Sequence, residues 1–453
     1  MIAKKGQNNQ LPLEIKAKFD ELKILKHLRQ AGIQKAFGFS SGYLFQLIFR
    51  LIFTQRNWYR LLESNKADDL PGKDAVYRFL NYPKFAWRRF LTALSVFTIM
   101  KVSRLTSTCH TKVLILDDSS FYRDRSKRVE LLAHCFDHAK RRHYKGFRML
   151  TLGWSDGSTF LPIDFSLLSS SKEKAKINDI DSTLDKRCSG YKRRIEALQT
   201  APEQIPGMVK RALSNGIDAS YVLMDSWFTQ QPLIKDLTDQ GIDVIGMVKP
   251  TNQRYRVGSQ WVGLRTLYRL SKSVTGHKEI LRSIRTTMAN GVPVKVVFVQ
   301  NRNKQSEWLA ILSTDCTLTE REIIRTYGMR WDIELFFKAT KSFLKLQKEF
   351  QGRSYDLLIS HTTIVFTRFI LLSWQNRCST DNRTLGGMFY ELCDEMNELD
   401  WAVALTQLMD ILHDAITKTK KSIKKWVTRQ LTQWIESLPN YIKVYLPKLG
   451  CES

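Results

Sequence analysis

Strand and helix signals between residues 113 and 248 limit the folds open to this chain more than any other feature. Residues 113–116 form a continuous apolar run, as expected for a central strand buried on both faces. Two further strands are predicted at 148–154 and 159–168, on either side of the dipeptide Asp156-Gly157, which is a strong hairpin signal. Helix and strand signals then alternate over 203–215, 221–224, 229–240 and 244–248.

This order of elements predicts a single mixed sheet. The first three strands form an antiparallel section, and right-handed crossovers through helices then add two parallel strands. The ribonuclease-H-like fold uses the same order. The predicted fold class is therefore α/β, a ribonuclease-H-like mixed sheet that is interrupted by an all-β insertion and has helical N- and C-terminal regions.

The segments around this core divide the chain into five predicted parts. Residues 1–105 have helical apolar spacing and many basic residues, which is typical of a helical DNA-binding domain. The core occupies 106–248 and 313–375, and its second part contains a long helix predicted from Thr319 to Lys345, with a capping-box pattern at its start. Residues 249–312 predict a β-rich insertion. Residues 376–453 predict a helical C-terminal region.

The charge balance indicates the kind of partner. The 453 residues include 71 Lys plus Arg against 44 Asp plus Glu, a formal net charge of +27. Such an excess favours a polyanionic partner, usually DNA or RNA. The seven cysteines are scattered singly, and we find no signal peptide and no credible membrane span. We therefore expect reduced thiols, a cytoplasmic location and no membrane partner.

Three acidic residues stand where an isolated charge would be unfavourable. Asp117 and Asp225 each directly follow a predicted buried strand, and Glu334 lies among apolar residues of the long helix. A buried carboxylate costs roughly several kcal/mol unless it is paired or bound to a cation. Parallel neighbouring strands would bring Asp117 and Asp225 side by side, where a divalent cation relieves their repulsion. Their oxygen ligands suit Mg²⁺, with Mn²⁺ as a substitute, and two such ions can clamp a phosphoryl displacement.

The helix around Glu334 also presents side chains that suit DNA phosphates. Tyr327, Arg330, Glu334 and Lys341 are spaced by 3, 4 and 7 residues, which returns each to nearly the same helix face. Arg330 can grip a phosphate with two hydrogen bonds, while Tyr327 and Lys341 can hold neighbouring phosphates. A stripe of ordinary surface charges is the alternative, and the apolar neighbours of Glu334 make it less favourable.

These residues resemble the Tyr-x2-Arg-x3-Glu-x6-Lys signature of bacterial insertion-sequence transposases of the DDE class, a cut-and-paste group that forms DNA hairpins. The residues around Asp117 and the segment Met224-Asp225-Ser226-Trp227-Phe228 are also similar to that group, over about residues 110–345. The resemblance implies that Asp117, Asp225 and Glu334 are the catalytic metal ligands. It further implies a nucleoid-associated homodimer, supported by the C-terminal region 376–453, that synapses terminal inverted repeats and joins them to target DNA.

Two assignments stay open at this level. Asp117 and Asp118 point to opposite faces of a strand, so only one can be the ligand; Asp117 is favoured because Ser119 shares its face. The family stacks a flipped base on an aromatic residue of the insertion. Trp308 resembles that position, with Trp261 as a second candidate and an ordinary core tryptophan as the alternative.

Three functions are compatible with these patterns. The first is a DNA transposase that performs metal-dependent strand cleavage and strand transfer at insertion-sequence ends. The second is another ribonuclease-H-like nuclease without strand transfer, and the third is a non-catalytic DNA-binding regulator derived from a transposase. The complete set of acids and the complete helix stripe favour the first.

Overall fold

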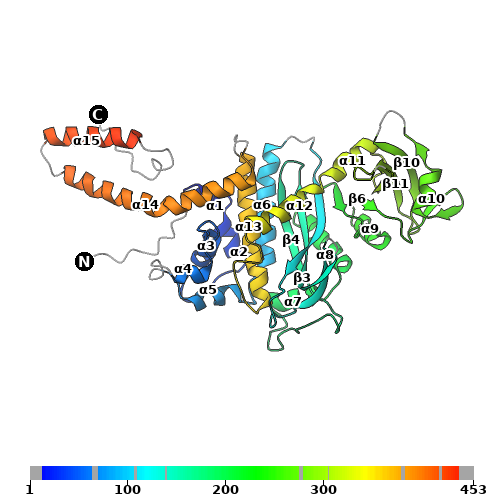
Figure 1. The fold of residues 1–453 in the computed structure, drawn as a ribbon, viewed down its shortest axis with the longest axis horizontal. Coiled ribbons are helices and arrows are strands. Elements are labelled where there is room, and N and C mark those ends of the chain that lie inside the picture. Colours follow the sequence, from blue (N-terminus) through cyan, green and yellow to red (C-terminus); the bar gives the residue numbers. More distant parts are fainter. Residues whose placement is uncertain are drawn as a thin grey trace.

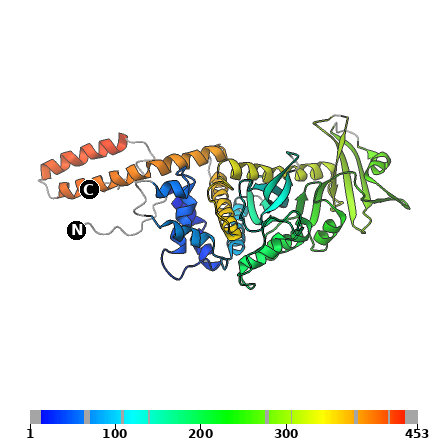
Figure 2. The same ribbon diagram turned by 60° about the horizontal axis from the view of Figure 1, so that its bottom comes forward.

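The chain forms an elongated molecule with a large sheet and its helices in the middle (Figure 1). The computed structural model describes residues 13–63, 70–106, 110–137, 140–274, 279–304, 306–378, 383–417 and 421–437. A β-rich part lies at one end of the molecule, and helices α14 (Leu385–Thr417) and α15 (Lys421–Ser437) lie at the other. The view turned by 60° shows α14 and α15 side by side, projecting from the body (Figure 2).

The described residues before the sheet are helical, as predicted. Their helices are α1 (Leu13–Glu21), α2 (Ile24–Gln30), α3 (Ser41–Leu51), α4 (Trp58–Leu62), α5 (Lys73–Leu80) and α6 (Trp87–Leu105). Ser40 and Asn57 begin α3 and α4 because their side-chain oxygens accept backbone N–H groups of the first turn. Apolar and aromatic side chains of α3, α5 and α6 join one buried core with the rest of the molecule.

The central sheet is mixed, as predicted from the sequence, with an antiparallel section followed by parallel strands. Its first strands are β1 (Val113–Tyr122), β2 (Ala133–Asp137), β3 (Arg142–Ser155), β4 (Phe160–Leu168), β5 (Tyr221–Met224) and β6 (Asp243–Val248). Strand β3 is antiparallel to β1, β2 and β4, whereas β1, β5 and β6 are parallel neighbours. Gly157 has a φ of 85° at the β3–β4 turn, where its missing side chain removes the steric penalty.

Helices connect and cover these strands. Helix α7 (Ser189–Ala197) precedes α8 (Ala201–Ser214), which leads into β5, and α9 (Gln231–Thr238) connects β5 to β6. Thr200 and Glu203 form a capping box at the start of α8, which fixes where this helix begins. The sequence did not predict β2. Strands β1 and β3 are longer than predicted, because residues 117–122 of β1 pair with β3 and residues 142–146 of β3 pair with β2.

The inserted segment extends the central sheet. Strand β12 (Trp308–Ser313) pairs antiparallel with β6, followed outward by β11 (Pro293–Gln300), β10 (Ile280–Thr287) and β9 (Lys272–Ser273). Strands β7 (Tyr255–Val257) and β8 (Gln260–Val262) form a small separate sheet. The segment also holds helix α10 (Leu264–Leu270), so it is β-rich rather than all-β as the fold class stated. Only Leu264 and Leu267 of this short helix are buried, too few positions to reveal helical spacing.

The long helix predicted from Thr319 to Lys345 is wrong in its continuity, because two helices occupy this segment. Helix α11 (Glu320–Gly328) begins at the predicted capping box, and α12 (Trp331–Ser342) follows. The backbone N–H groups of Met329 and Arg330 each bond to the carbonyl three residues earlier, which tightens the chain into a 3₁₀-like turn. Arg330 is thereby the N-cap residue of α12.

Helix α13 (Tyr355–Cys378) is the buried centre of the molecule. It packs against α3, α5, α6, α12 and β4. Its length and hydropathy would suit a membrane span, but its most apolar window is entirely buried inside the protein, as expected for a core helix. Within it, the buried Arg368 pairs with Glu349 and donates to the carbonyls of Ile48 and Phe49 at the end of α3.

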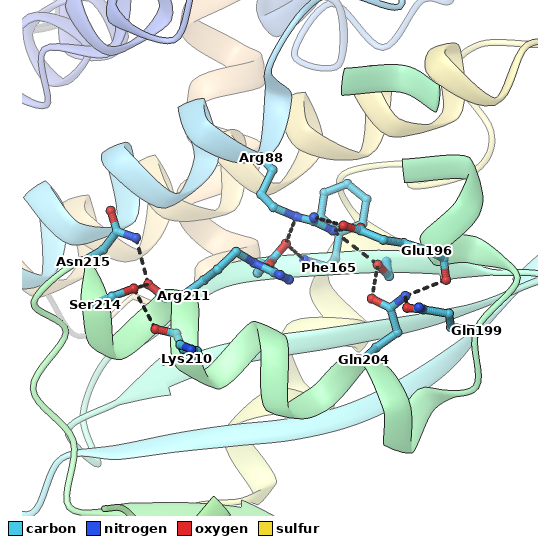
Figure 3. Close-up of polar contacts among 11 residues, drawn as sticks. Arg88, Phe165, Glu196, Gln199, Gln204, Lys210, Arg211, Ser214 and Asn215 are labelled. Carbon is cyan, nitrogen blue, oxygen red and sulfur yellow. Dashed lines mark hydrogen bonds and ion pairs between the residues drawn. The ribbon is translucent and has the colours of Figure 1, made fainter. Parts of the chain in front are cut away.

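A buried ionic cluster attaches α6 to the sheet and to α7 and α8 (Figure 3). We call Arg88, Asp164, Glu196 and Arg211 the anchoring cluster. Arg88 lies 2.9 Å from Asp164 and 2.7 Å from Glu196, and Arg211 lies 2.8 Å from Asp164. Burial alone would raise the pKa of Asp164, but the guanidinium groups of Arg88 and Arg211 hold that pKa below its ordinary value. Both carboxylates of this cluster are thus paired with guanidinium groups, and the buried Arg193 adds a third cation nearby.

Candidate active site

The parallel pairing of β1 and β5 brings two predicted acids together. Leu116 is the register partner of Met224, the last residue of β5. Asp117 and Asp225 are the next residues of their chains and therefore lie side by side at the carboxyl end of β5. The Asp225 Oδ1 atom accepts the backbone N–H of Trp227 at 2.9 Å and that of Phe228 at 3.2 Å. These bonds fix the chain where it leaves β5. The predicted adjacency of the two carboxylates is therefore present.

Asp117 lies largely buried beside other charges. Its Oδ2 atom accepts from Arg330 Nη1 at 2.9 Å, and its Oδ1 atom accepts the N–H of Asp118 at 2.8 Å. Burial raises the pKa of Asp117 to about 7; Arg330 opposes this rise, while the neighbouring carboxylates of Asp225 and Asp118 add to it. The acids here exceed the cations that neutralise them.

Helix α12 delivers Arg330 and Glu334 to Asp117. The two side chains are four residues apart, and Arg330 Nη2 donates to Glu334 Oε1 at 2.5 Å. One guanidinium thus bridges Asp117 on β1 and Glu334 on α12. Burial disfavours the charged guanidinium, but Tyr327 and the two carboxylates raise the pKa of Arg330 above its ordinary value. We call Asp117, Asp225, Arg330 and Glu334 the cavity cluster.

Asp117 and Asp118 have different partners, as the alternation of β1 requires. Asp118 forms an ion pair with Arg148 of β3. Ser119, two residues from Asp117, accepts a hydrogen bond from Lys341 of α12 at 2.5 Å. Asp117 and Ser119 therefore both meet α12, whereas Asp118 meets β3.

The remaining members of the helix stripe lie near these groups. Burial raises the pKa of Tyr327 to about 12; Arg330 opposes this effect, and Asp225 adds to it. Burial also lowers the pKa of Lys341, and the neighbouring Lys140 adds to that effect. Although α11 and α12 are separate helices, all four side chains of the stripe lie near Asp117 and Ser119 of β1 or near Asp225.

A cavity of about 770 Å³ opens beside the aspartates. Its walls carry acids, cations and aromatic rings, among them Asp117, Asp118, Asp225, Arg148, Lys140, Lys249, Lys341, Tyr122, Phe136, Tyr144 and Trp227. Arg330 and Glu334 are not among the described lining residues and reach Asp117 from α12. Arg148 and Trp227 were not predicted as site residues; the position of Trp227 two residues after Asp225 was the available signal.

The donor groups at this cavity fit a divalent cation in part. Asp117 and Asp225 offer carboxylate oxygens, the ligands that hard cations prefer. A bound cation would offset the burial and the neighbouring carboxylates that raise the pKa of Asp117. Glu334 is held by Arg330, and within the described ranges no three His, Cys, Asp or Glu side chains form a ready metal site. Two of the three predicted ligands therefore stand together, and the third is separated from them by a guanidinium.

The two tryptophans considered for base stacking lie in the inserted segment. Trp308, at the start of β12, stacks on Tyr268 with ring centroids 4.9 Å apart and meets Phe298 edge-on. Trp261, on β8, is about half exposed. The packing of Trp308 agrees with the alternative of an ordinary core residue.

Comparison with known proteins identifies a family. The family described as DDE superfamily endonuclease matches residues 55–299, more than half of the chain, including Asp117 and Asp225. No curated protein matches the sequence.

The piggyBac transposase, in a cryo-EM structure of its synaptic complex with hairpin DNA, aligns with a TM-score of 0.45 and 12% identity over 99% of this chain and 87% of that chain. The Drosophila P element transposase, in a strand transfer complex, aligns with a TM-score of 0.22 and 11% identity over 56% and 54% of the two chains. Both structural similarities are too low to support an argument.

Proposed function

Because the chain belongs to the DDE superfamily endonucleases, we propose that it is a DNA transposase that cuts and rejoins DNA at the ends of a bacterial insertion sequence. The observation that carries this proposal is the meeting of the signature helix with β1. Arg330 contacts Asp117 and Glu334, and Lys341 contacts Ser119, so the Tyr-x2-Arg-x3-Glu-x6-Lys pattern adjoins the paired aspartates.

Asp117, Asp225 and Glu334 are the proposed catalytic residues and metal ligands. DDE superfamily endonucleases generally use divalent metal ions. Two bound Mg²⁺ ions would lower the pKa of the attacking water or hydroxyl and stabilise the leaving oxygen. Asp117 and Asp225 would hold the cations directly. Glu334 would join them once Arg330 transfers its hydrogen bonds from the carboxylates to a DNA phosphate.

The reaction proposed is cut-and-paste transposition. Water attacks the phosphodiester at the end of the element and frees a 3′-hydroxyl. This hydroxyl attacks a phosphodiester of the opposite strand, displaces the 3′-oxygen of the flanking DNA, and closes a hairpin on the element end. The hairpin is reopened by water, and the freed 3′-hydroxyl then attacks target DNA. Arg330, Tyr327 and Lys341 would hold the phosphates in line during these steps, since positioning and charge stabilisation dominate phosphoryl transfer.

Other parts of the chain take supporting roles in this proposal. The basic helices before β1 would bind the terminal inverted repeats, and the C-terminal helices would support a homodimer that synapses two ends. The protein would then be a nucleoid-associated cytoplasmic enzyme. The net charge of +27 is consistent with contact along extended DNA.

The base-stacking role of Trp308 stays a prediction. If Trp308 stacks a flipped base, Trp308→Ala should block hairpin formation on the transposon end. Since the ring packs on Tyr268 and Phe298, the variant should also be less stable. A folded Trp308→Ala enzyme that forms hairpins normally would remove this role.

One assay separates the candidate functions. Purified protein is incubated with Mg²⁺, a labelled DNA fragment carrying the inverted repeat that flanks the gene, and a plasmid target. Joined product supports a transposase. Cleavage without joining would indicate a nuclease, and binding without cleavage a DNA-binding regulator, so either result would overturn the proposal.

A further inference from the structure

A hollow beyond the end of β1 is lined by cations that have no part in the proposed chemistry. It has a volume of about 370 Å³ and lies between residues 125–129, which follow β1, and residues 351–353. Four of its lining side chains are exposed and basic: Arg125, Lys127, Arg128 and Arg353. We call these four residues the basic hollow. The described residues that line it include no acid.

The charges of the basic hollow are not neutralised within the described part of the chain. None of its four side chains forms an ion pair or a side-chain hydrogen bond with another described residue. By contrast, Lys112 at the opposite end of β1 lies 2.7 Å from Asp218. Asp124, the only acid among residues 123–128, accepts the backbone N–H of Lys145 and does not line the hollow. Neighbouring cations repel one another, and a polyanion that binds across them relieves this repulsion.

Hydrogen bonds hold the backbone on both sides of the hollow in place. Asn178 Nδ2 donates to the carbonyl of Lys127 at 3.0 Å and to that of Val129 at 2.7 Å. The backbone N–H of Glu130 donates to the carbonyl of Arg353 at 2.8 Å, which joins the two segments. The four cations therefore extend from fixed backbone positions, so less conformational entropy is lost when they bind a ligand.

The same two segments connect the basic hollow to the candidate active site. Strand β1 carries Asp117, and α12 carries Glu334. Beyond α12, Gln347 binds β1 twice: its Oε1 atom accepts the N–H of Tyr122 at 3.1 Å, and its Nε2 atom donates to the carbonyl of Ser120 at 3.1 Å. The five residues from Asp117 to Tyr122 span about 17 Å, the length of about five base pairs of DNA.

We propose that the basic hollow binds the phosphate backbone of duplex DNA about half a helical turn from the scissile phosphate. The described lining residues include no aromatic ring, so this surface can bind phosphates but offers no ring on which a base could stack. Because the hollow is joined to both β1 and α12, a duplex held there would be fixed relative to Asp117. The inference rests on the proposed function, which places the scissile phosphate at Asp117.

The test counts the phosphate contacts through the salt dependence of binding. The full-length protein is measured with Ca²⁺ in place of Mg²⁺ on two DNAs. One is a duplex carrying the inverted repeat that flanks the gene, and the other is a branched duplex in which that end is already joined to target DNA. The double variant Arg125→Gln, Arg128→Gln should reduce the slope of log affinity against log salt by about 2, since each lost phosphate contact removes about 0.9. Arg353→Gln, on the other segment, should reduce the slope by about 1.

The two DNAs distinguish the source of the phosphates. A smaller slope on the simple duplex assigns the basic hollow to the DNA of the element end, and a smaller slope on the branched duplex alone assigns it to target DNA. Either result supports the inference. Wild-type slopes on both DNAs in the double variant, at normal thermal stability, would overturn it, as would wild-type slopes in Arg353→Gln.

A matched control separates local contacts from net charge. The double variant Lys112→Gln, Lys235→Gln also removes two positive charges, but these already pair with Asp218 and Asp239. Its slopes should equal those of the wild type. An equal loss of slope in this control would show that only net charge matters and would overturn the inference.

The outcome is independent of the test for transposition, because no DNA is cleaved or joined with Ca²⁺. A protein that joins DNA but shows wild-type slopes in the variants of the basic hollow loses this inference and keeps the proposed function. Conversely, if no DNA is joined but the slopes fall as expected, the proposed reaction fails and the duplex-binding surface remains.

Discussion

The cavity cluster and the anchoring cluster are both built from arginines and acidic residues, but their charges are arranged differently. In the anchoring cluster, Arg88 and Arg211 pair with Asp164 and Glu196, Arg193 lies nearby, and the pKa of Asp164 falls below its ordinary value. In the cavity cluster, one guanidinium faces an excess of carboxylates, and the pKa of Asp117 rises to about 7. A cluster in which every carboxylate is paired with a guanidinium stabilises the fold as it stands. A cluster with surplus carboxylates favours the binding of a further cation, which is the charge pattern expected of a binding site.

The largest effect should separate Asp117 from Asp118. Asp117→Asn should slow DNA cleavage on the order of a thousandfold, equivalent to about 4 kcal/mol of transition-state stabilisation, because it removes a metal ligand. Its free energy of unfolding should stay within about 1 kcal/mol of the wild type, since a neutral side chain relieves crowding. Cleavage rates and urea denaturation curves measure both quantities.

Asp118→Asn is the matched control for this prediction. It removes the partner of Arg148 and should slow cleavage by about tenfold or less, because its effect on the reaction is indirect. A nearly active Asp117→Asn enzyme beside an inactive Asp118→Asn enzyme would exchange the roles of the two residues.

Removing the acid of the anchoring cluster should affect stability instead. Asp164→Asn leaves Arg88 and Arg211 without their shared, buried carboxylate and should lower the free energy of unfolding by about 3–5 kcal/mol at neutral pH. Catalytic rate per folded molecule should be preserved. Equal stability of the variant and the wild type would mean that this cluster does not anchor α6 to the sheet.

The pH dependence of that difference has a definite sign. The pKa of Asp164 is depressed in the folded protein, so its stabilising contribution is fully present above the unfolded pKa, about 3.9, and is lost as the pH falls through the lower folded value. The gap in unfolding free energy between wild type and Asp164→Asn should therefore be constant near neutral pH. It should narrow below about pH 4.

The third prediction concerns the guanidinium between the cavity carboxylates. Arg330→Gln should raise the affinity for Mn²⁺ about tenfold, measured by calorimetry without DNA, because a neighbouring positive charge opposes cation binding. The same variant should cleave DNA more slowly, since it loses a phosphate contact. Adding Asp225→Asn to Arg330→Gln should remove the gain. Unchanged Mn²⁺ affinity in Arg330→Gln would argue against an ion held by Asp117 and Glu334 together.

The sheet and the aspartate pair could be predicted because their signals are local. Residues 113–116 and 221–224 are apolar runs that each end in an acid, and parallel pairing of such runs leaves little choice about where the acids meet. The stripe from Tyr327 to Lys341 was likewise visible as a spacing. The extension of the sheet by β12 and β11 was not visible, because it depends on β6 and β12 pairing across more than sixty residues of intervening chain.

Features that depend on tertiary contacts could not be predicted from the sequence. The break at Met329 and Arg330 lies within a segment whose apolar spacing stays helical, and only the hydrogen bonds of the folded chain reveal it. The ion pair between Arg88 and Asp164 joins residues 76 positions apart, and nothing in either local sequence marks it. Trp308 matched a position in a family pattern, but pattern alone cannot tell a ring that faces DNA from one packed on Tyr268.

The smallest predicted effect concerns Lys341, which we expect to contact a DNA phosphate. In the described part of the chain Lys341 has no carboxylate in ion-pair contact, and it donates to the Ser119 hydroxyl instead. Lys341→Gln should weaken binding of the transposon end only a few-fold and should reduce the slope of log affinity against log salt by about 1, as expected for one lost phosphate contact. Arg211→Gln is the control: its charge is already met by Asp164, so the slope should not change. Equal slopes for Lys341→Gln and the wild type would mean that Lys341, like the paired Arg211, does not contact a DNA phosphate.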